Sequence, residues 1–228
     1  ERRADGDWGA EECASELRKA MISFDRPKLR EDNQLNYELF SRDAEMAIER
    51  QQFPTEFLVL NQMDGLPRDV PSMIAMMPSA KTKDYEDILA RLGGIPVLID
   101  QTIELLQEGL RRGIVPPKVP LRTVADQVSG QVHISPMTSP MLSKFKIFPD
   151  TIPAAEQTRL TEAAKVVYAD EVRPALKRLH LFLRDEYVTN CRATVGRSAL
   201  PNGRAWYDHQ IKHYTTTTLG ADEIHDIG

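Results

Sequence analysis

Apolar residues recur every three to four positions over much of the chain, a spacing that predicts amphipathic helices. Residues 11–24 carry such a stripe, with acidic residues early and basic residues late, as the helix dipole favours. Pro27 ends this segment, and a second stripe extends from a cap at Asp32 or Asn33 to Phe53. The chain is therefore expected to open with two successive helices.

Prolines and glycines divide the next part of the chain. Residues 54–82 contain four prolines and predict an ordered connection with one short helix. Helical spacing returns at 84–92, stops at Gly93-Gly94, and resumes after Pro96 up to a C-terminal cap at Gly113. This pattern predicts an αα-hairpin that turns at the two glycines. A phosphate-binding loop there is the weaker alternative, since no strand pattern precedes it and no Gly-Lys-Ser/Thr follows it.

The longest helical pattern comes late. A shorter helix is expected to begin at Pro120, and residues 133–153 are expected to be irregular. Residues 154–191 then repeat apolar positions at helical spacing, with Pro174 inside the run. Because an internal proline removes a hydrogen bond and clashes with the preceding turn, a kink or break is predicted at 170–173.

These elements predict a mainly α fold, an antiparallel helical bundle-like array with Pro-rich connections and at most one short strand near 214–218. No internal boundary is indicated, so residues 1–228 are expected to form a single helical unit. A last helix is expected to open near Gly220, and its stripe of Ile224 and Ile227 ends before two turns are complete. The chain is therefore expected to be the front part of a larger protein.

Composition narrows the function classes. The chain is 41% hydrophobic and 28% charged, and its formal net charge is -5 with scattered positive residues. Nucleic acid is therefore not an expected partner. No run approaches the roughly 18 apolar residues of a membrane-spanning helix. The first residue is Glu1, so either a targeting segment was removed or the start was trimmed.

Cys13 and Cys191 are the two cysteines, and they form no CxxC motif. A zinc ribbon and a thioredoxin-type site are excluded. Two isolated buried thiols are the favoured interpretation, with a disulfide as the alternative.

Three methionines and one histidine favour structural roles. Met73, Met76 and Met77 have helical spacing, so core packing is favoured over an adaptable binding surface. His180 lies in the long helical pattern and is expected to be a hydrogen-bonded core or boundary residue.

The sharpest chemical pattern is His209-Gln210-Ile211-Lys212-His213. Four residues apart on a helix, the two imidazoles could share one zinc ion. Gln210 stands where a metalloprotease of this spacing needs a carboxylate base, so a partly exposed polar face is favoured. Glu223 and His225 could supply a further ligand or base, but acids at a helix start and a histidine on an exposed turn are the favoured interpretation.

Two neighbouring segments admit structural and binding interpretations. Thr215–Thr218 is expected to be a short edge strand, and β-addition of a peptide to that edge is the functional alternative. Pro201-Asn202-Gly203 predicts a turn that leads into a helix bearing Arg204, Trp206 and Tyr207, which suit packing and ligand contact equally well.

Several pieces of the sequence occur in a characteristic order: residues 57–65, 84–92, 100–109, 200–203, Tyr207, residues 214–216 and residues 223–228. In these pieces and their order the sequence resembles the bacterial domain-of-unknown-function 885 family. The resemblance implies a mostly helical body related to zinc metallopeptidases of the gluzincin type. It also implies a zinc helix, with a His-Glu pair and a later Pro-Gly-His, downstream of residue 228.

No metal ligand or general base of the family matches this sequence, so no catalytic or metal residue is assigned. The resemblance implies no cofactor in this chain, zinc in the full-length parent, and a peptide or peptide-like substrate. Substrate contacts are expected from Tyr207, Tyr214, Thr215 and Thr216. The resemblance favours an exported or periplasmic location, with the cytoplasm as the alternative. The first function hypothesis, which follows from the resemblance, is the N-terminal helical portion of a zinc-dependent peptidase-like hydrolase that forms scaffold and part of the substrate cleft. The second is a non-catalytic helical binding or scaffold module that uses the Met-rich and Pro-rich segments.

Overall fold

The computed structural model describes residues 10–228 and the side chains from residue 15 onward. The described chain forms helices and no β-sheet, which confirms the mainly α prediction. It divides into two compact units. The central unit is residues 55–196, and the terminal unit combines the described residues up to Pro54 with residues 197–228. The expectation that residues 1–228 form a single helical unit within a larger domain stays a prediction.

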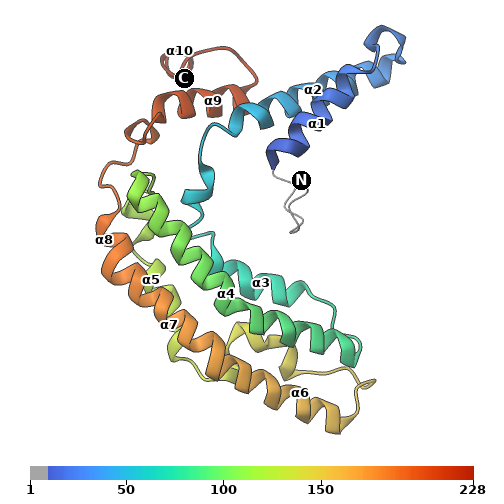
Figure 1. Ribbon diagram of the computed structural model, residues 1–228, viewed down its shortest axis with the longest axis vertical. Helices are drawn as coiled ribbons and strands as arrows, with labels where there is room; N and C mark the ends of the chain where they lie inside the picture. Colours follow the sequence, from blue (N-terminus) through green and yellow to red (C-terminus); the bar gives the residue numbers. More distant parts are fainter. Residues whose placement is uncertain (1–9) are drawn as a thin grey trace, which may run out of the picture. The chain divides into compact units, whose positions relative to one another are not determined.

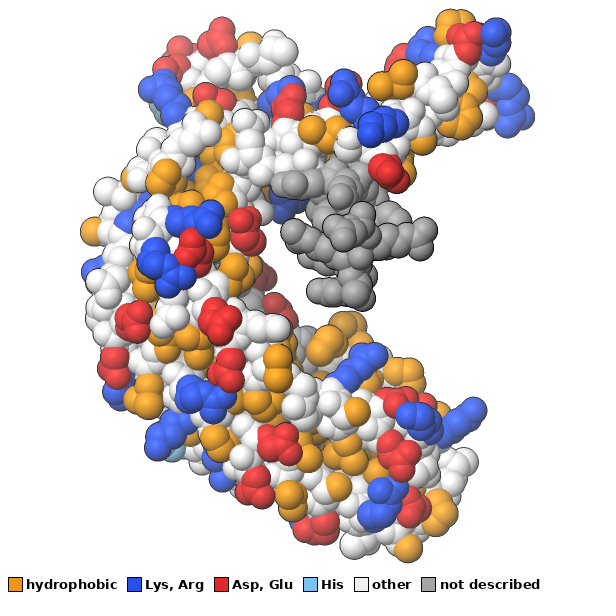
Figure 2. Space-filling model, in the orientation of Figure 1, with side chains coloured by type: hydrophobic (Ala, Val, Ile, Leu, Met, Phe, Trp, Pro, Cys, Tyr) orange, Lys and Arg blue, Asp and Glu red, His pale blue; other side chains and the backbone are white. Residues whose placement is uncertain are grey.

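Four helices make up the terminal unit (Figure 1): α1 (Ala10–Ile22), α2 (Glu31–Arg50), α9 (Gly203–Thr215) and α10 (Ala221–Ile227). Helix α1 packs against α2, and α2 also contacts α9. The two opening helices are thus where the apolar stripes predict them, within a few residues. Hydrophobic side chains nevertheless remain exposed on α1, α2 and the turn between them, among charged ones (Figure 2): Leu17, Ile22, Phe24, Leu35, Leu39 and Phe40.

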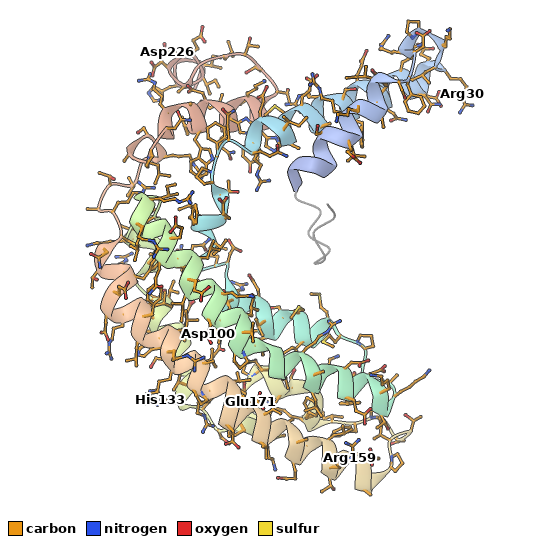
Figure 3. All side chains as sticks on the ribbon, in the orientation of Figure 1. Arg30, Asp100, His133, Arg159, Glu171 and Asp226 are labelled. Atoms are coloured by element: carbon orange, nitrogen blue, oxygen red, sulfur yellow. The ribbon has the colours of Figure 1, made fainter. Side chains whose placement is uncertain are left out.

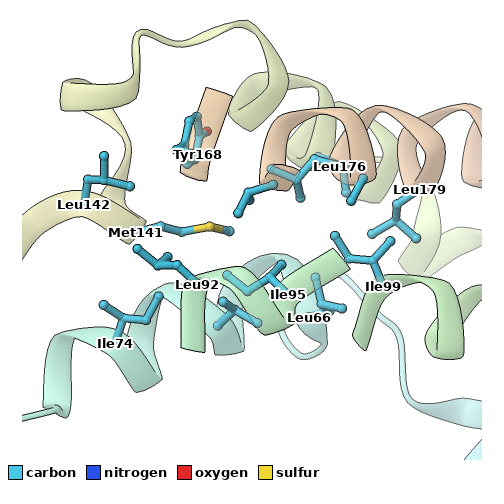
Figure 4. Close-up of a cluster of buried hydrophobic side chains, with 14 of the residues drawn as sticks. Leu66, Ile74, Leu92, Ile95, Ile99, Met141, Leu142, Tyr168, Leu176 and Leu179 are labelled. Carbon is cyan, nitrogen blue, oxygen red and sulfur yellow. The ribbon is translucent and has the colours of Figure 1, made fainter. Parts of the chain in front are cut away.

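The central unit contains the larger core. Its helices are α3 (Leu66–Met76), α4 (Thr82–Arg112), α5 (Val124–His133), α6 (Ala154–Val167), α7 (Arg173–Phe182) and α8 (Val188–Asn190). The Pro-rich segment before α6 forms short 3-10 turns, including η5 (Pro140–Lys146). Figure 4 shows α3, α4, η5 and the segment from α6 to α7 contributing to one core: Leu66, Ile74, Leu92, Ile95, Ile99, Met141, Leu142, Tyr168, Leu176 and Leu179.

Helix α4 is one continuous helix of 31 residues, so the predicted αα-hairpin at Gly93-Gly94 is wrong. Neither glycine has a positive φ, and Pro96 lies inside the helix. The alternative of a phosphate-binding loop fails for the same reason. The C-terminal cap at Gly113 is confirmed, since this residue has the left-handed φ of 69° and its N–H reaches back to the last turn.

Burial explains why α4 continues through residues that disfavour a helix. A glycine costs a helix interior about 1 kcal/mol and a proline about 3 kcal/mol. On the same helix Ile88, Leu92, Ile95 and Ile99 are buried at helical spacing. Each such side chain contributes about 1.5–3 kcal/mol when removed from water. The apolar face therefore outweighs the local preference for a turn.

Helix α4 runs parallel to the long helical segment from α6 to α7, not antiparallel to it. Arg159 of α6 bonds Glu86 at 2.9 Å, and Arg178 of α7 bonds Asp100 at 2.9 Å. From the first pair to the second, the residue number increases in both helices, so the two chain directions are the same (Figure 3 labels Arg159 and Asp100). A parallel pair needs a long return connection, and the chain from Gly113 to α6 provides it.

Helix α5 belongs to that connection and packs antiparallel to α7. Nδ1 of His180 lies 2.9 Å from the carbonyl oxygen of Ala125, while Arg173 donates to the carbonyl of Ile134 at 3.3 Å. From one pair to the other, the residue number increases in α5 and decreases in α7, so the two helices have opposite directions. The prediction that His180 is a hydrogen-bonded boundary residue is confirmed.

The irregularity predicted before Pro174 is a π turn at Tyr168–Val172. There the N–H of Arg173 bonds the carbonyl of Tyr168, five residues back. This wider turn opens the helix where an α-helical turn would press the proline ring against the Asp170 carbonyl. The irregularity thus lies at the predicted position, and the helix continues through it without the predicted break. A second π turn, Leu183–Tyr187, has no proline or glycine that marks it in the sequence.

The methionine prediction is correct for one residue of three. The buried face of α3 includes Val70 and Ile74 and extends to Met77, whereas Met73 and Met76 fall outside that face and are exposed. Core packing was therefore the wrong prediction for Met73 and Met76.

Cys191 is a buried free thiol, as predicted. Burial is the main cause that raises its pKa to about 12, and the nearby positive charges of Lys118 and Arg192 oppose the shift. The side chain of Cys13, and hence the alternative of a disulfide, lies outside the described residues.

Two glycine substitutions test the continuity of α4. Gly94→Ala is expected to raise the free energy of unfolding by about 0.5–1 kcal/mol, because the site is helical and an added Cβ meets nothing within 4 Å. Gly113→Ala is the matched control. It is expected to lower the free energy of unfolding by about 1–2 kcal/mol, because alanine would have to adopt the left-handed conformation of this cap. Urea unfolding measures both, and destabilisation by Gly94→Ala would contradict a continuous helix.

Thiol labelling tests the burial of Cys191. In a Cys13→Ser variant at pH 8, Ellman's reagent is expected to react with Cys191 far more slowly in buffer than in urea. A pKa of about 12 leaves roughly a thousandfold less thiolate than in the unfolded chain. Equal rates in buffer and in urea would show an accessible thiol.

Candidate functional site

Helix α9 carries most of the residues singled out in the sequence, and the turn before it fixes where it begins. Asn202 has the left-handed φ of 53°, and the helix starts at Gly203. A Cβ on Gly203 would lie 2.1 Å from the carbonyl oxygen of Arg197, so only glycine permits this approach. The predicted turn at Pro201-Asn202-Gly203 is confirmed.

One face of α9 is anchored in the terminal unit through Trp206. Its ring stacks on Phe53, with centroids 5.7 Å apart and an interplanar angle of 12°. The guanidinium of Arg197 also contacts the Trp206 ring and lies 4.7 Å from its centroid. Trp206 thus serves packing, one of the two roles that the sequence allowed.

His209 extends that anchored face by one turn. Its side chain is 7% exposed, its ring centroid lies 5.2 Å from that of Phe53, and its Nδ1 lies 3.5 Å from Oε2 of Glu49 without a hydrogen bond. Nζ of Lys212 donates to both oxygens of Glu49, at 2.6 and 2.9 Å. α9 is therefore attached to the end of α2 by a stacked, partly charged cluster.

The electrostatics of this cluster favour a neutral imidazole. Burial lowers the pKa of His209, and the carboxylate of Glu49 opposes the shift only in part, while His213 and Lys212 add to it. The pKa of Glu49 is lowered chiefly by its hydrogen bond from Lys212. Glu49 thus stays ionised beside an uncharged His209 near neutral pH.

The opposite face of α9 lines a pocket of about 270 Å³ with α10. Its lining residues are Tyr207, Gln210, Ile211, Tyr214, Thr215, Ala221 and Ile224. None of them is charged. Tyr207 and Tyr214 are 47% and 76% exposed, so both rings are available to a ligand.

Three of the four residues expected to contact substrate, Tyr207, Tyr214 and Thr215, meet at this pocket, and Thr216 follows outside its lining. Sequence reasoning missed Ile211 and Ile224. The spacing of Ile211, four residues after Tyr207 on the same helix, is the signal that could have found it.

No strand forms at residues 214–218, so the predicted edge strand is wrong, and β-addition there has no edge to use. Thr215 is the last residue of α9, and its Oγ1 donates to the Ile211 carbonyl at 2.8 Å. Thr216 then ends the helix in the left-handed conformation, with φ of 59°. Thr215 thus has its hydrogen bonds within the helix, and these outweigh the preference of β-branched threonines for a strand.

His209 and His213 do not fit a zinc site. His209 is enclosed by Phe53 and Glu49, whereas His213 is exposed and its ring lies 4.9 Å from that of Tyr214. Among the described residues, no three His, Cys, Asp or Glu side chains gather where a metal ion could be held. The zinc expected for the full-length parent therefore has no ligand set in the part of the chain described here.

The acids and the histidine of α10 have the structural roles that the sequence favoured. The carboxylate of Glu223 accepts a hydrogen bond from the N–H of Gly220 at 2.7 Å and so caps the helix. His225 lies on an exposed turn.

Comparison with known proteins adds a family. A family model described as "Bacterial protein of unknown function (DUF885)" matches residues 3–228. A solved structure described as "The crystal structure of the putative lipoprotein from Colwellia psychrerythraea" is similar with a TM-score of 0.81 and 19% identity. The match covers 96% of this chain and 40% of that chain, and at this identity it shows the fold alone. No curated protein matches. No helix in the described residues has both the length and the hydrophobicity needed to cross a membrane.

The buried imidazole gives the terminal unit a pH-dependent stability. Because the pKa of His209 is lower in the folded than in the unfolded chain, the unfolded chain takes up this proton first as pH falls below about 6.5. The stability that the neutral His209 contributes above pH 6.5 is thus lost as the pH falls through the pKa of His209 in the folded chain. His209→Gln is expected to lose less stability than the natural chain between pH 7.5 and pH 5.

Urea unfolding across this range measures the effect, and it stays above the pH at which protonation of Glu49 contributes. His213→Gln is the matched control, because it removes an exposed imidazole from the same helix. Identical pH dependence in the natural chain and His209→Gln would contradict the role of the buried imidazole.

Proposed function

The chain belongs to the DUF885 family of bacterial proteins, and we propose that it forms the N-terminal helical portion of a zinc-dependent, peptidase-like hydrolase. In this proposal it supplies scaffold and one part of the substrate cleft. The zinc ion and the general base come from the rest of the full-length parent, which fits a chain that spans 40% of the length of its solved relative.

The observation that carries the proposal is the pocket on α9 and α10. Tyr207, Tyr214 and Thr215, the substrate contacts expected from the sequence, all line it. Exposed aromatic rings offer large contact area at low entropic cost, which suits recognition of a peptide. Thr216 is the fourth proposed contact.

The chain's own residues would bind and orient a peptide and would not activate water. A zinc ion in the parent would polarise the scissile carbonyl and lower the pKa of a bound water molecule. The anchored face of α9, through Trp206 and His209, would keep the tyrosines in place for that task.

A second candidate is a non-catalytic helical binding or scaffold module. The exposure of Met73 and Met76 on α3 favours it, because flexible thioether side chains suit adaptable binding surfaces. This alternative predicts that the full-length parent has no bound metal and hydrolyses no peptide.

Metal analysis and peptide turnover of the full-length parent test the proposal. Zinc is expected in stoichiometric amount, and hydrolysis of a peptide library is expected to stop with a chelator and return with zinc. A parent without zinc and without turnover would contradict the hydrolase and leave the binding module.

Tyr214→Ala in the parent is expected to lower kcat/KM about three- to tenfold, because one exposed aromatic contact contributes about 0.5–1.5 kcal/mol. Tyr37→Ala, on α2 and outside the pocket lining, is the matched control. Equal values for the two variants would remove Tyr214 from the substrate contacts.

A further inference from the structure

We infer that the pocket on α9 and α10 binds one uncharged, apolar side chain of the peptide, and so sets the side-chain preference of the protein. The inference rests on the proposed function for the substrate class. It adds which chemical group enters the pocket and which residues select it.

The lining chemistry selects against charge. Ile211 and the two tyrosine rings come from α9, while Ala221 and Ile224 come from α10. No Lys, Arg, Asp or Glu lines the pocket, so a charged group that entered would lose hydration without gaining an ion pair. An apolar group would lose only unfavourable contact with water.

One polar side chain of the lining, the amide of Gln210, fits the backbone of a peptide. The Thr215 hydroxyl already bonds the Ile211 carbonyl and the Thr217 hydroxyl. The side chain of Gln210 has no hydrogen-bond partner among the described residues. Its amide both donates and accepts, which matches the N–H and C=O groups that flank a peptide side chain.

The size of the pocket indicates one side chain. Its volume of about 270 Å³ is below the roughly 300–1,000 Å³ of sites that enclose a drug-sized ligand. It is many times the roughly 10–15 Å³ that a cavity needs to hold one water molecule. The pocket therefore has room for a single aliphatic or aromatic side chain and is too small to enclose a whole peptide.

The test uses the full-length parent and peptides of alanine in which one position carries Leu, Asp or Lys. Binding is measured by calorimetry with a chelator present, so that no turnover occurs, and hydrolysis is measured separately with zinc. At one position along the peptide, Leu is expected to bind about tenfold or more tightly than Asp or Lys.

Two charge-introducing variants sharpen the test. Ile224→Glu and Tyr207→Glu are each expected to remove the preference for Leu and to favour Lys at the same position. Ile227→Glu is the matched control, since this residue is on the same helix, 75% exposed and outside the lining. It is expected to keep the natural preference. Two substitutions on different helices keep the test decisive if one of them disturbs folding.

The outcomes separate this inference from the proposed function. Selective binding that follows the variants, without zinc-dependent turnover, supports the pocket and contradicts the hydrolase. Zinc-dependent turnover with no preference for Leu, or with a preference that neither Ile224→Glu nor Tyr207→Glu changes, overturns the inference and leaves the hydrolase standing. Absence of both binding and turnover overturns both.

Discussion

The central unit depends on one long apolar seam, in which the buried face of α4 packs along α6 and α7 in the same chain direction. Burial on this seam is large enough to hold Gly93, Gly94 and Pro96 in a helix. It also aligns the charged residues at its edges, where Arg159 pairs with Glu86 and Arg178 pairs with Asp100. These exposed pairs add little stability by themselves, so they report the alignment of the helices and do not cause it.

Helix α9 follows a different logic, because its two faces have different tasks. Trp206 and His209 are three residues apart and bury themselves against Phe53 and Glu49. Tyr207, by contrast, begins a face that lines the pocket with α10. A one-residue shift in where α9 begins would rotate the helix by about 100° and move Trp206 and His209 out of their contacts with Phe53 and Glu49. Gly203 prevents that shift, since no other residue fits against the Arg197 carbonyl.

The sequence predicted those features that local chemistry decides. The turn before Gly203, the cap at Gly113 and the irregularity before Pro174 each follow from the conformational limits of one residue. It failed at the glycines of α4, where distant burial outweighs local preference, and at the threonine run after Tyr214, where the end of α9 occupies part of the run. The π turn at Leu183–Tyr187 and the parallel direction of α4 were also out of reach, because no local residue encodes a contact with a helix some 75 positions away.

The candidate site was predictable only in part for the same reason. Tyr207, Tyr214 and Thr215 could be singled out from their motif, but the pocket they line exists only because α10 folds back beside α9. Thr216 ends α9 in the left-handed conformation, and the short segment after it brings the chain back to α10. Ala221 and Ile224 then face a helix with which they share no sequence pattern. The threonine run thus contributes to the site by ending a helix, a role that its β-branched composition conceals.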